Sequence, residues 1–440
     1  MYQSFHFTSI GASHIKKGTV CQDFSASVET EKYKLAVVSD GHGGADYFRS
    51  DRGSRFAAEA FCACVREAFY GAESGETKNQ NAEQDVYGGS EAESGENAYA
   101  AENDEASAQN QPFLQNRAKN FADALNACKT EKQTEEQMLW FIRSVIARWN
   151  ALAEEDAAAE PFRREELAAV SDKARAYYEK GEKIQSAYGA TLIGVVAAED
   201  FWFGVQIGDG KCVVFGRDGE ECEPIPWDDK CFLNITTSIC DFNAGSEFRY
   251  YFGRDMPAAV FAGSDGIDDS FKNERHLHNF YRVVLTSFAA KSASFAAREL
   301  EQYLPNLSAR GSADDMSVGC VLDVEYIKAN AQLFEKRKEP YLKLFRIGNL
   351  GAADASDDYV QKKEIEAEEG VFSFSTLGCG GFGKGSDVFE ILAVGENSAR
   401  LRIDKTEYNV SPSERIVIEK QKQNGDVCEY DTLIIQYILK

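Results

Sequence analysis

The chain has 440 residues, of which 43% are hydrophobic, and a formal net charge of −24. This negative charge would repel phosphate backbones, so nucleic acid is not an expected partner. No window approaches the ~18 consecutive apolar residues of a membrane helix, and the start lacks a basic stretch before an apolar segment. We therefore expect no membrane insertion or export. The eleven cysteines are scattered without a C-x-x-C pair, which favours free thiols and a cytoplasmic location.

The first part of the chain predicts a strand followed by helices. Residues 34–39 form an apolar, β-branched run typical of a buried strand. A helix is predicted from Ser50, because apolar residues recur at helical spacing as far as Phe69. Residues 113–178 are rich in helix-forming residues, and residues 138–156 have the pattern of an amphipathic helix.

Residues 71–110 differ in composition from the rest of the chain. They contain ten Asp or Glu against one Lys, with many Gly, Ser and Asn and almost no large aliphatic side chains. Such a segment cannot bury enough apolar surface to offset its ordering entropy. We interpret it as an acidic disordered insertion in a loop, and as a solvated spacer in preference to a functional tether.

After Ser186 the pattern changes to short β-type runs separated by turn residues, which indicates an α+β architecture of helices packed on sheets. A length of 440 residues also favours one large domain with a smaller one. We expect a large domain over residues 1–324, a linker over 325–370 and a small β-rich module over 371–440. The stretch LGCGGFGKG (377–385) is interpreted as a mobile turn in preference to a phosphate-binding loop.

An Asp-Gly pair follows an apolar run at three places: Asp40, Asp209 and Asp265. A single Asp-Gly pair is usually a hairpin turn, and Asp218-Gly219, between polar residues, is predicted to be one. The other three carboxylates end runs apolar enough to be buried strands, where an unpaired charge is costly. Asp23 and the pair Asp314-Asp315, which precede other β-type runs, belong to the same pattern.

Carboxylates that converge at one end of a sheet require positive charge among them. Two like charges 4 Å apart repel by ~4 kcal/mol at an effective dielectric constant of 20. Oxygen donors without a His or Cys cluster select Mg²⁺ or Mn²⁺, and two such ions can activate water and clamp a phosphoryl group.

His42, two residues after Asp40, is a candidate proton donor for the departing alkoxide. A His beside glycines is more often a surface residue, but the neighbouring Asp-Gly reverses that preference. Gly43 and Gly44 would let a substrate approach closely.

Six blocks, in this order, resemble the metal-dependent serine/threonine protein phosphatases of type 2C, particularly their bacterial branch: GASHIKKGTVCQD (11–23), VVSDGHGG (37–44), YGATLIGVV (188–196), VQIGDGKCVVF (205–215), FAGSDGIDD (261–269) and GSADDMSVGC (311–320). The resemblance covers about residues 5–324. It implies a four-layer α-β-β-α sandwich with two or three Mn²⁺ or Mg²⁺ ions at one end of the paired sheets.

The resemblance also implies roles for individual residues. The metal ligands would be the side chains of Asp23, Asp40, Asp265 and Asp314, with the carbonyl of Gly41. Asp209 would help to hold a third, weaker metal together with Asp265, and His42 would be the general acid.

The chain departs from the family pattern at several positions near these residues. Gln22 stands where many members have Glu, and Gly18 stands where they have the Arg that holds the substrate phosphate. His14, Lys16 or Lys17 would have to take over that task, and His14 and Lys17 are the candidates for binding the substrate phosphate. Asp315 replaces a frequent Asn, and Gly210 follows Asp209 where a small hydroxyl residue is common. These changes put phosphate affinity in question and leave the predicted ligands intact.

Two functions remain open at this point. The chain is expected to be a phosphatase that removes phosphate from Ser or Thr of proteins phosphorylated by a cytoplasmic kinase, and so to act in signalling. The alternative is a catalytically weak protein of the same fold that binds phosphoproteins or acts as a scaffold. Intact acidic ligands favour the first hypothesis. No G-x-S-x-G motif is present and the cysteines have no nearby His, so a Ser or Cys nucleophile is not expected.

Overall fold

The computed structural model describes residues 2–71, 121–231, 235–291, 293–348, 359–373, 388–395, 397–403, 405–412, 414–424 and 427–440. The chain divides into two compact units, Met1–Lys336 and Arg337–Lys440. The acidic insertion expected at residues 71–110 lies outside the described residues except for Gly71, and residues 377–385 also lie outside them.

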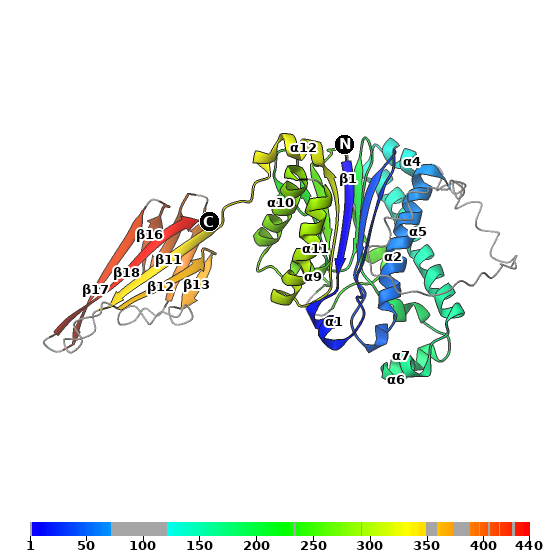
Figure 1. Ribbon diagram of the computed structural model, residues 1–440, viewed down its shortest axis with the longest axis horizontal. Coiled ribbons are helices and arrows are strands. Elements are labelled where there is room, and N and C mark those ends of the chain that lie inside the picture. Colours follow the sequence, from blue (N-terminus) through cyan, green and yellow to red (C-terminus); the bar gives the residue numbers. More distant parts are fainter. Residues whose placement is uncertain are drawn as a thin grey trace. The chain divides into compact units, whose positions relative to one another are not determined.

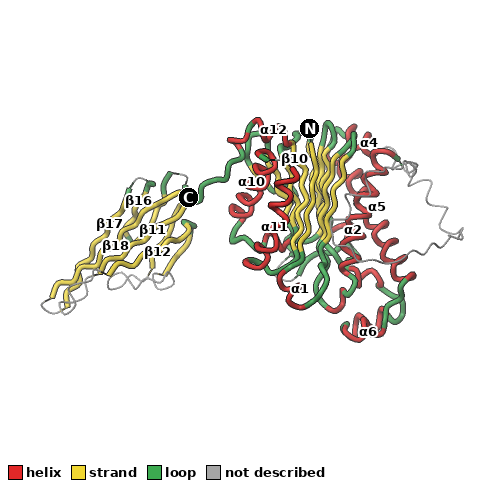
Figure 2. Tube along the Cα trace, in the orientation of Figure 1, coloured by secondary structure: helices red, strands yellow, loops and turns green. Residues whose placement is uncertain are grey.

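The first unit contains two five-stranded sheets in which neighbouring strands are antiparallel (Figures 1 and 2). The first sheet has the order β1 (Tyr2–Ser9), β10 (Met316–Asp323), β9 (Ala259–Gly263), β6 (Lys211–Phe215) and β7 (Glu221–Cys222). The second sheet has the order β2 (Phe24–Glu29), β3 (Lys34–Ser39), β4 (Leu192–Ala197), β5 (Trp202–Ile207) and β8 (Arg249–Gly253). The predicted hairpin at Asp218-Gly219 is confirmed, since it joins the paired strands β6 and β7.

Helices cover the outer face of each sheet (Figure 1). The second sheet is covered by α2 (Ser50–Tyr70), α4 (Phe121–Ala127) and α5 (Glu131–Ala159), and the first sheet by α10 (Glu274–Ala290) and α11 (Ala293–Arg310). The other helices among the described residues of this unit are α1 (Ala12–Lys17), α6 (Arg164–Ala169), α7 (Asp172–Tyr178), α8 (Ala244–Glu247), α9 (Asp265–Asp268), α12 (Val324–Ala329) and the short 3-10 turns η1 (Ala45–Tyr47), η2 (Ile184–Tyr188) and η3 (Ala331–Leu333). The expected four-layer α-β-β-α sandwich is confirmed.

The burial of β3 explains its uninterrupted apolar sequence. Leu35 and Val37 pack against the helix layer, whereas Ala36 and Val38 face the other sheet. Successive side chains of a strand point to opposite faces, so a strand in an inner layer needs apolar residues on both. The strand therefore shows no polar alternation, as the sequence predicted.

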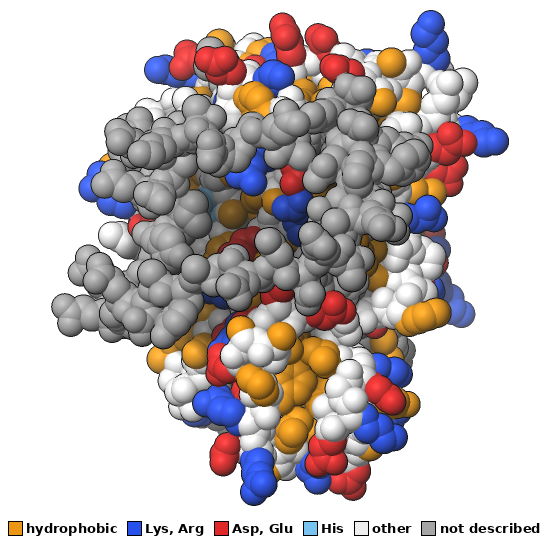
Figure 3. Space-filling model, turned by 90° about the vertical axis from the view of Figure 1, so that its right-hand side faces the viewer, with side chains coloured by type: hydrophobic (Ala, Val, Ile, Leu, Met, Phe, Trp, Pro, Cys, Tyr) orange, Lys and Arg blue, Asp and Glu red, His pale blue; other side chains and the backbone are white. Residues whose placement is uncertain are grey.

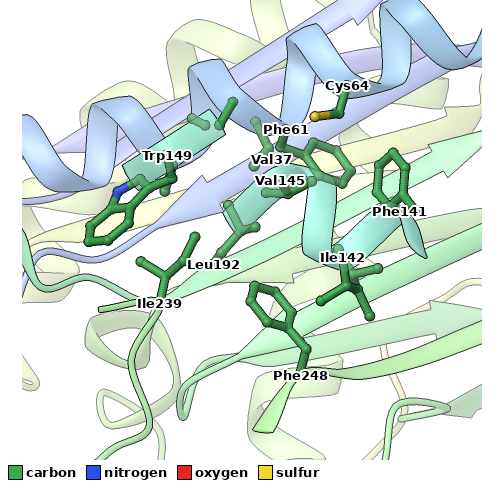
Figure 4. Close-up of a cluster of buried hydrophobic side chains, with 14 of the residues drawn as sticks. Val37, Phe61, Cys64, Phe141, Ile142, Val145, Trp149, Leu192, Ile239 and Phe248 are labelled. Atoms are coloured by element: carbon green, nitrogen blue, oxygen red, sulfur yellow. The ribbon is translucent and has the colours of Figure 1, made fainter. Parts of the chain in front are cut away.

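The helices predicted from Ser50 and over residues 138–156 are present as α2 and α5. They pack together on the second sheet, and Figure 4 shows Phe141 of α5 beside Phe61 of α2, with ring centroids 5.8 Å apart. The indole Nε1 of Trp149 donates a hydrogen bond of 2.9 Å to the carbonyl of Gly53, which satisfies a polar atom inside the core.

The second unit consists of two four-stranded antiparallel sheets that share one core. One sheet has the order β12 (Tyr359–Glu366), β11 (Pro340–Gly348), β18 (Val427–Leu439) and β17 (Arg415–Asn424), and the other has β13 (Gly370–Ser373), β14 (Val388–Val394), β15 (Ala399–Ile403) and β16 (Thr406–Val410).

The expected linker at residues 325–370 contains regular structure, including α12, β11 and β12. Its charged residues suggested a linker, but in β11 they alternate with the buried Leu342 and Leu344. That alternation is the pattern of a half-buried strand. The second unit thus begins at Arg337, earlier than the sequence indicated.

Across the described residues, no helix combines the length and apolar character needed to cross a membrane. On the face seen in Figure 3, Lys and Arg side chains are interspersed with Asp and Glu over the visible described residues. The cysteines described in side-chain detail are free thiols.

Candidate metal centre

The register of the two sheets places five turns at one end of the first unit. In the second sheet Phe24 pairs with Ser39. Asp23 and Asp40 are the next residues beyond this pair, one on each strand, so they lie at the same end of the sheet. In the first sheet Gly263 pairs with both Lys211 and Val318, which brings the neighbouring turns of Asp209, Asp265 and Asp314 to the corresponding strand ends. The short helix α1 lies at this end (Figure 1). Strand pairing thus gathers carboxylates that are far apart in the chain.

Asp23 is buried, with only 6% of its surface exposed, and its Oδ2 has no hydrogen-bond partner among the described residues. Burial raises the pKa of Asp23 well above its usual value, and the charge of Asp315 adds to the rise. Interactions with the hydroxyls of Ser264 and Ser317 lower the pKa of Asp23 in part. A buried carboxylate oxygen without a partner is costly unless a cation or proton compensates for it.

Asp40 and Asp265 interact directly through their side chains. Burial raises the pKa of Asp40 well above its usual value, and the charges of Asp23, Asp265 and Asp314 add to the rise. Burial likewise raises the pKa of Asp265 to about 6, and its Oδ1 is another buried oxygen with no partner among the described residues. The four predicted ligands therefore act on one another electrostatically, as a single cluster.

The other acidic residues lie around this cluster. The pKa of Asp209, in the turn between β5 and β6, is raised by burial, and the charge of Asp209 in turn raises the pKa of Asp265. Asp314 is exposed at the edge of the cluster. One ligand atom from each of His14, Asp314 and Asp315 lies within 4.8 Å of the others, a spacing that could also hold an ion.

Asp315, which in the sequence is only a departure from the family pattern, anchors the loop that carries α1. Its Oδ1 accepts a hydrogen bond of 2.6 Å from the backbone amide of Gly11, and its Oδ2 accepts one of 2.6 Å from the amide of Gln22. Nδ1 of His14 lies 2.8 Å from Oδ2. Asp315 thereby fixes both ends of the loop that carries α1. The only sequence feature that pointed to this anchoring role was the second Asp of the Asp314-Asp315 pair.

His14 and Lys17, the candidates for binding the substrate phosphate, are in different situations. The Nδ1 atom of His14 is engaged by Asp315. Lys17 is exposed in the last turn of α1. Gly18, at the family's Arg position, ends α1 in a left-handed conformation with φ of 68°. Lys17 is thus the candidate with a free cationic end.

The loop after Asp40 is held by its neighbours on both sides. The amide of Gly41 donates to the carbonyl of Gln22 over 3.1 Å, and the amide of His42 donates to the carbonyl of Gly189 over 3.0 Å. A Cβ atom on Gly41 would lie 2.5 Å from the carbonyl oxygen of Ser50. Because of this close approach only glycine fits at position 41.

His42 is half-buried, and its ring packs edge-on against Tyr47, with ring centroids 5.0 Å apart and an interplanar angle of 73°. Burial lowers the pKa of His42 to about 4. This value lies below the ordinary imidazole pKa near 6.5. The cause is desolvation of the charged form, which a primary sequence does not reveal.

A family model described as Protein phosphatase 2C matches residues 10–305. The chain belongs to the protein phosphatase 2C family. The match includes the turns of Asp23, Asp40, Asp209 and Asp265 and ends before Asp314. No curated protein matches the chain.

Three solved structures of phosphatases are similar to the chain at low identity. A serine/threonine phosphatase of S. agalactiae is 17% identical, covers 73% of this chain and 99% of its own, and has a TM-score of 0.38. The serine/threonine phosphatase Stp1 from Staphylococcus aureus is 11% identical, with coverages of 73% and 95% and a TM-score of 0.38. The catalytic domain of the serine threonine protein phosphatase PstP, solved in complex with 2 manganese ions, is 13% identical, with coverages of 73% and 99% and a TM-score of 0.36.

Proposed function

We propose that this protein phosphatase 2C family member is a metal-dependent phosphatase that hydrolyses phosphoserine and phosphothreonine on proteins. The observation that supports it most strongly is the single cluster formed by Asp23, Asp40, Asp265 and Asp314, in which burial and neighbouring carboxylates raise the pKa values of Asp23, Asp40 and Asp265. Such a cluster is stable at neutral pH only with compensating cations or protons.

The donor set fits Mg²⁺ or Mn²⁺. Its atoms are carboxylate oxygens, and one on Asp23 and one on Asp265 are buried without a hydrogen-bond partner in the described part of the chain. Hard divalent cations prefer such ligands. We propose that Asp23, Asp40, Asp265 and Asp314 hold two ions with the carbonyl of Gly41, and that Asp209 contributes to a third. When bound, such ions lower the pKa of a coordinated water and neutralise phosphoryl charge.

The protein's own groups would handle the proton and the substrate. His42 is the proposed proton donor to the leaving alkoxide. Partial burial lowers the pKa of His42 to about 4, which favours the neutral ring at pH 7, but a phosphate dianion beside the ring would favour its protonated form. The exposed Gly43 and Gly44 leave room for the phosphorylated side chain, and Lys17 is the proposed cation for the phosphate oxygens.

The proposed substrates are proteins phosphorylated by a serine/threonine kinase, and the proposed setting is signalling in the cytoplasm. The family description supports the protein substrate class. The net charge of −24 argues for protein partners over nucleic acids.

The test is Mn²⁺-dependent hydrolysis of an aryl phosphate and of a phosphothreonine peptide by the full chain. Asp40→Asn and Asp265→Asn should each lower kcat/KM at least a hundredfold, and chelation should abolish turnover. Asp229→Asn, an exposed Asp outside the cluster, is the matched control and should retain activity. Peptide binding without any turnover by the unmodified chain would instead support the scaffold function.

A further inference from the structure

The chain carries a segment between α5 and β4 that sits beside the candidate catalytic loop. This α6–α7 segment (residues 160–188) contains α6, α7 and η2. In Figure 1, α6 and α7 lie at the same end of the first unit as α1. The segment therefore belongs to the end of the sandwich where the Asp cluster lies.

Arg49 ties the α6–α7 segment to the first turn of α2. This side chain is almost fully buried; its Nη1 lies 3.1 Å from Oδ2 of Asp156, and its Nε lies 3.4 Å from Oε1 of Glu166. Its guanidinium also lies over the ring of Phe162 at 4.8 Å. An arginine with paired charges and a stacked aromatic ring is a rigid attachment point. The segment is thus fixed in place.

A cavity of about 190 Å³ lies between the α6–α7 segment and the turn η1. We call it the Tyr47 cavity; its lining includes Tyr47, Lys173, Tyr177, Tyr178, Lys183 and Ser186. Tyr47 also contacts the ring of His42, with centroids 5.0 Å apart. One aromatic ring therefore separates the cavity from the proposed proton donor.

The Tyr47 cavity presents cationic groups. Lys173 and Lys183 both line it, and Asp46 is the one carboxylate in its lining. The two carboxylate oxygens of Asp46 already accept hydrogen bonds from the amide and hydroxyl of Ser171, over 2.7 and 2.8 Å. The two lysines outnumber the single carboxylate, so the lining of the cavity carries a net positive charge. The acidic cluster lies at the same end of the first unit.

Lys183 is held in an unusual backbone conformation. Its φ is 53°, in the left-handed region that non-glycine residues seldom adopt. Its ammonium lies 4.3 Å from the centroid of the Tyr177 ring, which fixes the side chain within the cavity lining. Backbone strain of this kind persists where the surrounding structure enforces it, and it concentrates at functional sites.

We propose that the Tyr47 cavity binds an anionic side chain of the protein substrate, a carboxylate or a second phosphate, close in sequence to the phosphorylated residue. The proposal rests on the proposed phosphatase function. An extended peptide advances about 3.3–3.6 Å per residue, so a side chain one to three residues away can reach past the Tyr47 ring. Lysine ammonium groups and tyrosine and serine hydroxyls can all donate hydrogen bonds to such an anion.

The test compares three phosphothreonine peptides with Mn²⁺-loaded full chain. They are identical except for Gln, Glu or a second phosphoserine within three residues of the phosphothreonine. The unmodified chain should prefer the Glu or the phosphoserine peptide to the Gln peptide by about tenfold in kcat/KM, mainly through KM. A preference for only one of them identifies which anion the cavity accepts. Equal rates for all three peptides would overturn the proposal.

The decisive variant is the double substitution Lys173→Gln with Lys183→Gln. It should reduce the preference for the anionic peptides to less than about twofold, with each rate expressed relative to aryl phosphate hydrolysis by the same variant. Lys180→Gln, an exposed lysine of the same segment outside the lining, should keep the preference. The same loss in Lys180→Gln would mean a general charge effect and would overturn the proposal.

Binding of fluorescein-labelled peptides, followed by anisotropy, separates this proposal from the phosphatase function. If the chain hydrolyses no phosphate, the phosphatase function fails, and the cavity is judged by binding alone. Tighter binding of the anionic peptides, lost in the double variant and kept in Lys180→Gln, supports the cavity. Equal binding of the three peptides overturns it.

Discussion

The backbone amide of Gln22 donates a hydrogen bond to Oδ2 of Asp315, 293 positions further along the chain, over 2.6 Å. Oδ1 of the same carboxylate accepts from the amide of Gly11. Asp23 follows Gln22 directly, and Asp314 precedes Asp315. This carboxylate thus joins two segments that each carry a predicted metal ligand.

Replacing Asp315 with asparagine should destabilise the first unit. Both oxygens of Asp315 accept backbone N–H groups, so either orientation of the amide would turn a donor toward a donor. We expect a loss of about 1–3 kcal/mol in the free energy of unfolding, measured by urea denaturation. Asp229→Asn is the control and should change it by less than ~0.5 kcal/mol. Equal stability of the two variants would contradict the anchoring role.

Gly41 and Gly43 form a matched pair for testing the catalytic loop. A Cβ at Gly41 would lie 2.5 Å from the Ser50 carbonyl and 2.6 Å from that of Gln22, whereas a Cβ at Gly43 meets nothing within 4 Å. Gly41→Ala should cost about 1–3 kcal/mol of stability and weaken Mn²⁺ binding. Gly43→Ala should leave thermal unfolding close to that of the unmodified chain. Comparable melting temperatures for the two variants would argue against the loop geometry.

The contact between Arg49 and Glu166 predicts a pH-dependent contribution to stability. Burial tends to raise the pKa of Glu166, but hydrogen bonds from Arg163 and Arg49 outweigh it and lower the pKa to about 2. A lowered carboxyl pKa stabilises the fold above the unfolded value near 4.3 and loses that effect as pH falls toward 2.

Glu166→Gln should therefore cost about 1 kcal/mol at pH 7, a figure that allows for screening of this partly solvated group. The difference from the unmodified chain should shrink as the pH falls from 4.5 to 2.5, followed by urea denaturation at each pH. A constant difference across that range would contradict the role assigned to the ion pair.

Asp40 should destabilise the metal-free protein. A carboxyl pKa raised by burial and by neighbouring carboxylates favours folding at low pH, and that stability is lost as pH rises through the folded-state value. At pH 7.5 with chelator, Asp40→Asn should be more stable than the unmodified chain by at least about 1 kcal/mol. At pH 4 the two should be nearly equal in thermal unfolding. A less stable variant at pH 7.5 would show that Asp40 carries no uncompensated charge.

The gathering of acidic turns could be predicted from the sequence because part of its signal is local. Asp40 follows a run that is apolar on both faces, and a strand between two layers requires such a run. Antiparallel pairing of β2 with β3 then puts the turns of Asp23 and Asp40 at one end of the sheet. The role of Asp315 depended on contacts with Gly11 and Gln22 that no local pattern encodes.

The Tyr47 cavity and the lowered pKa of His42 also could not be predicted. Residues 113–178 showed helical composition, but composition does not state where α7 packs or which side chains face Tyr47. The same limit applies to β11, whose charged outward face suggested a linker. The Tyr47 cavity, the lowered pKa of His42 and the strand β11 all depend on packing against segments that are distant in the sequence.

The central claim is that carboxylates from separate turns form one site for divalent cations. Calorimetric titration of Mn²⁺ into the metal-free full chain at pH 7.5, with Asp40→Asn and Asp229→Asn alongside, tests it most directly. The account predicts at least two ions per chain for the unmodified protein and for Asp229→Asn, and at least a hundredfold weaker binding for Asp40→Asn. No binding by the unmodified chain, or unchanged binding by Asp40→Asn, would contradict it.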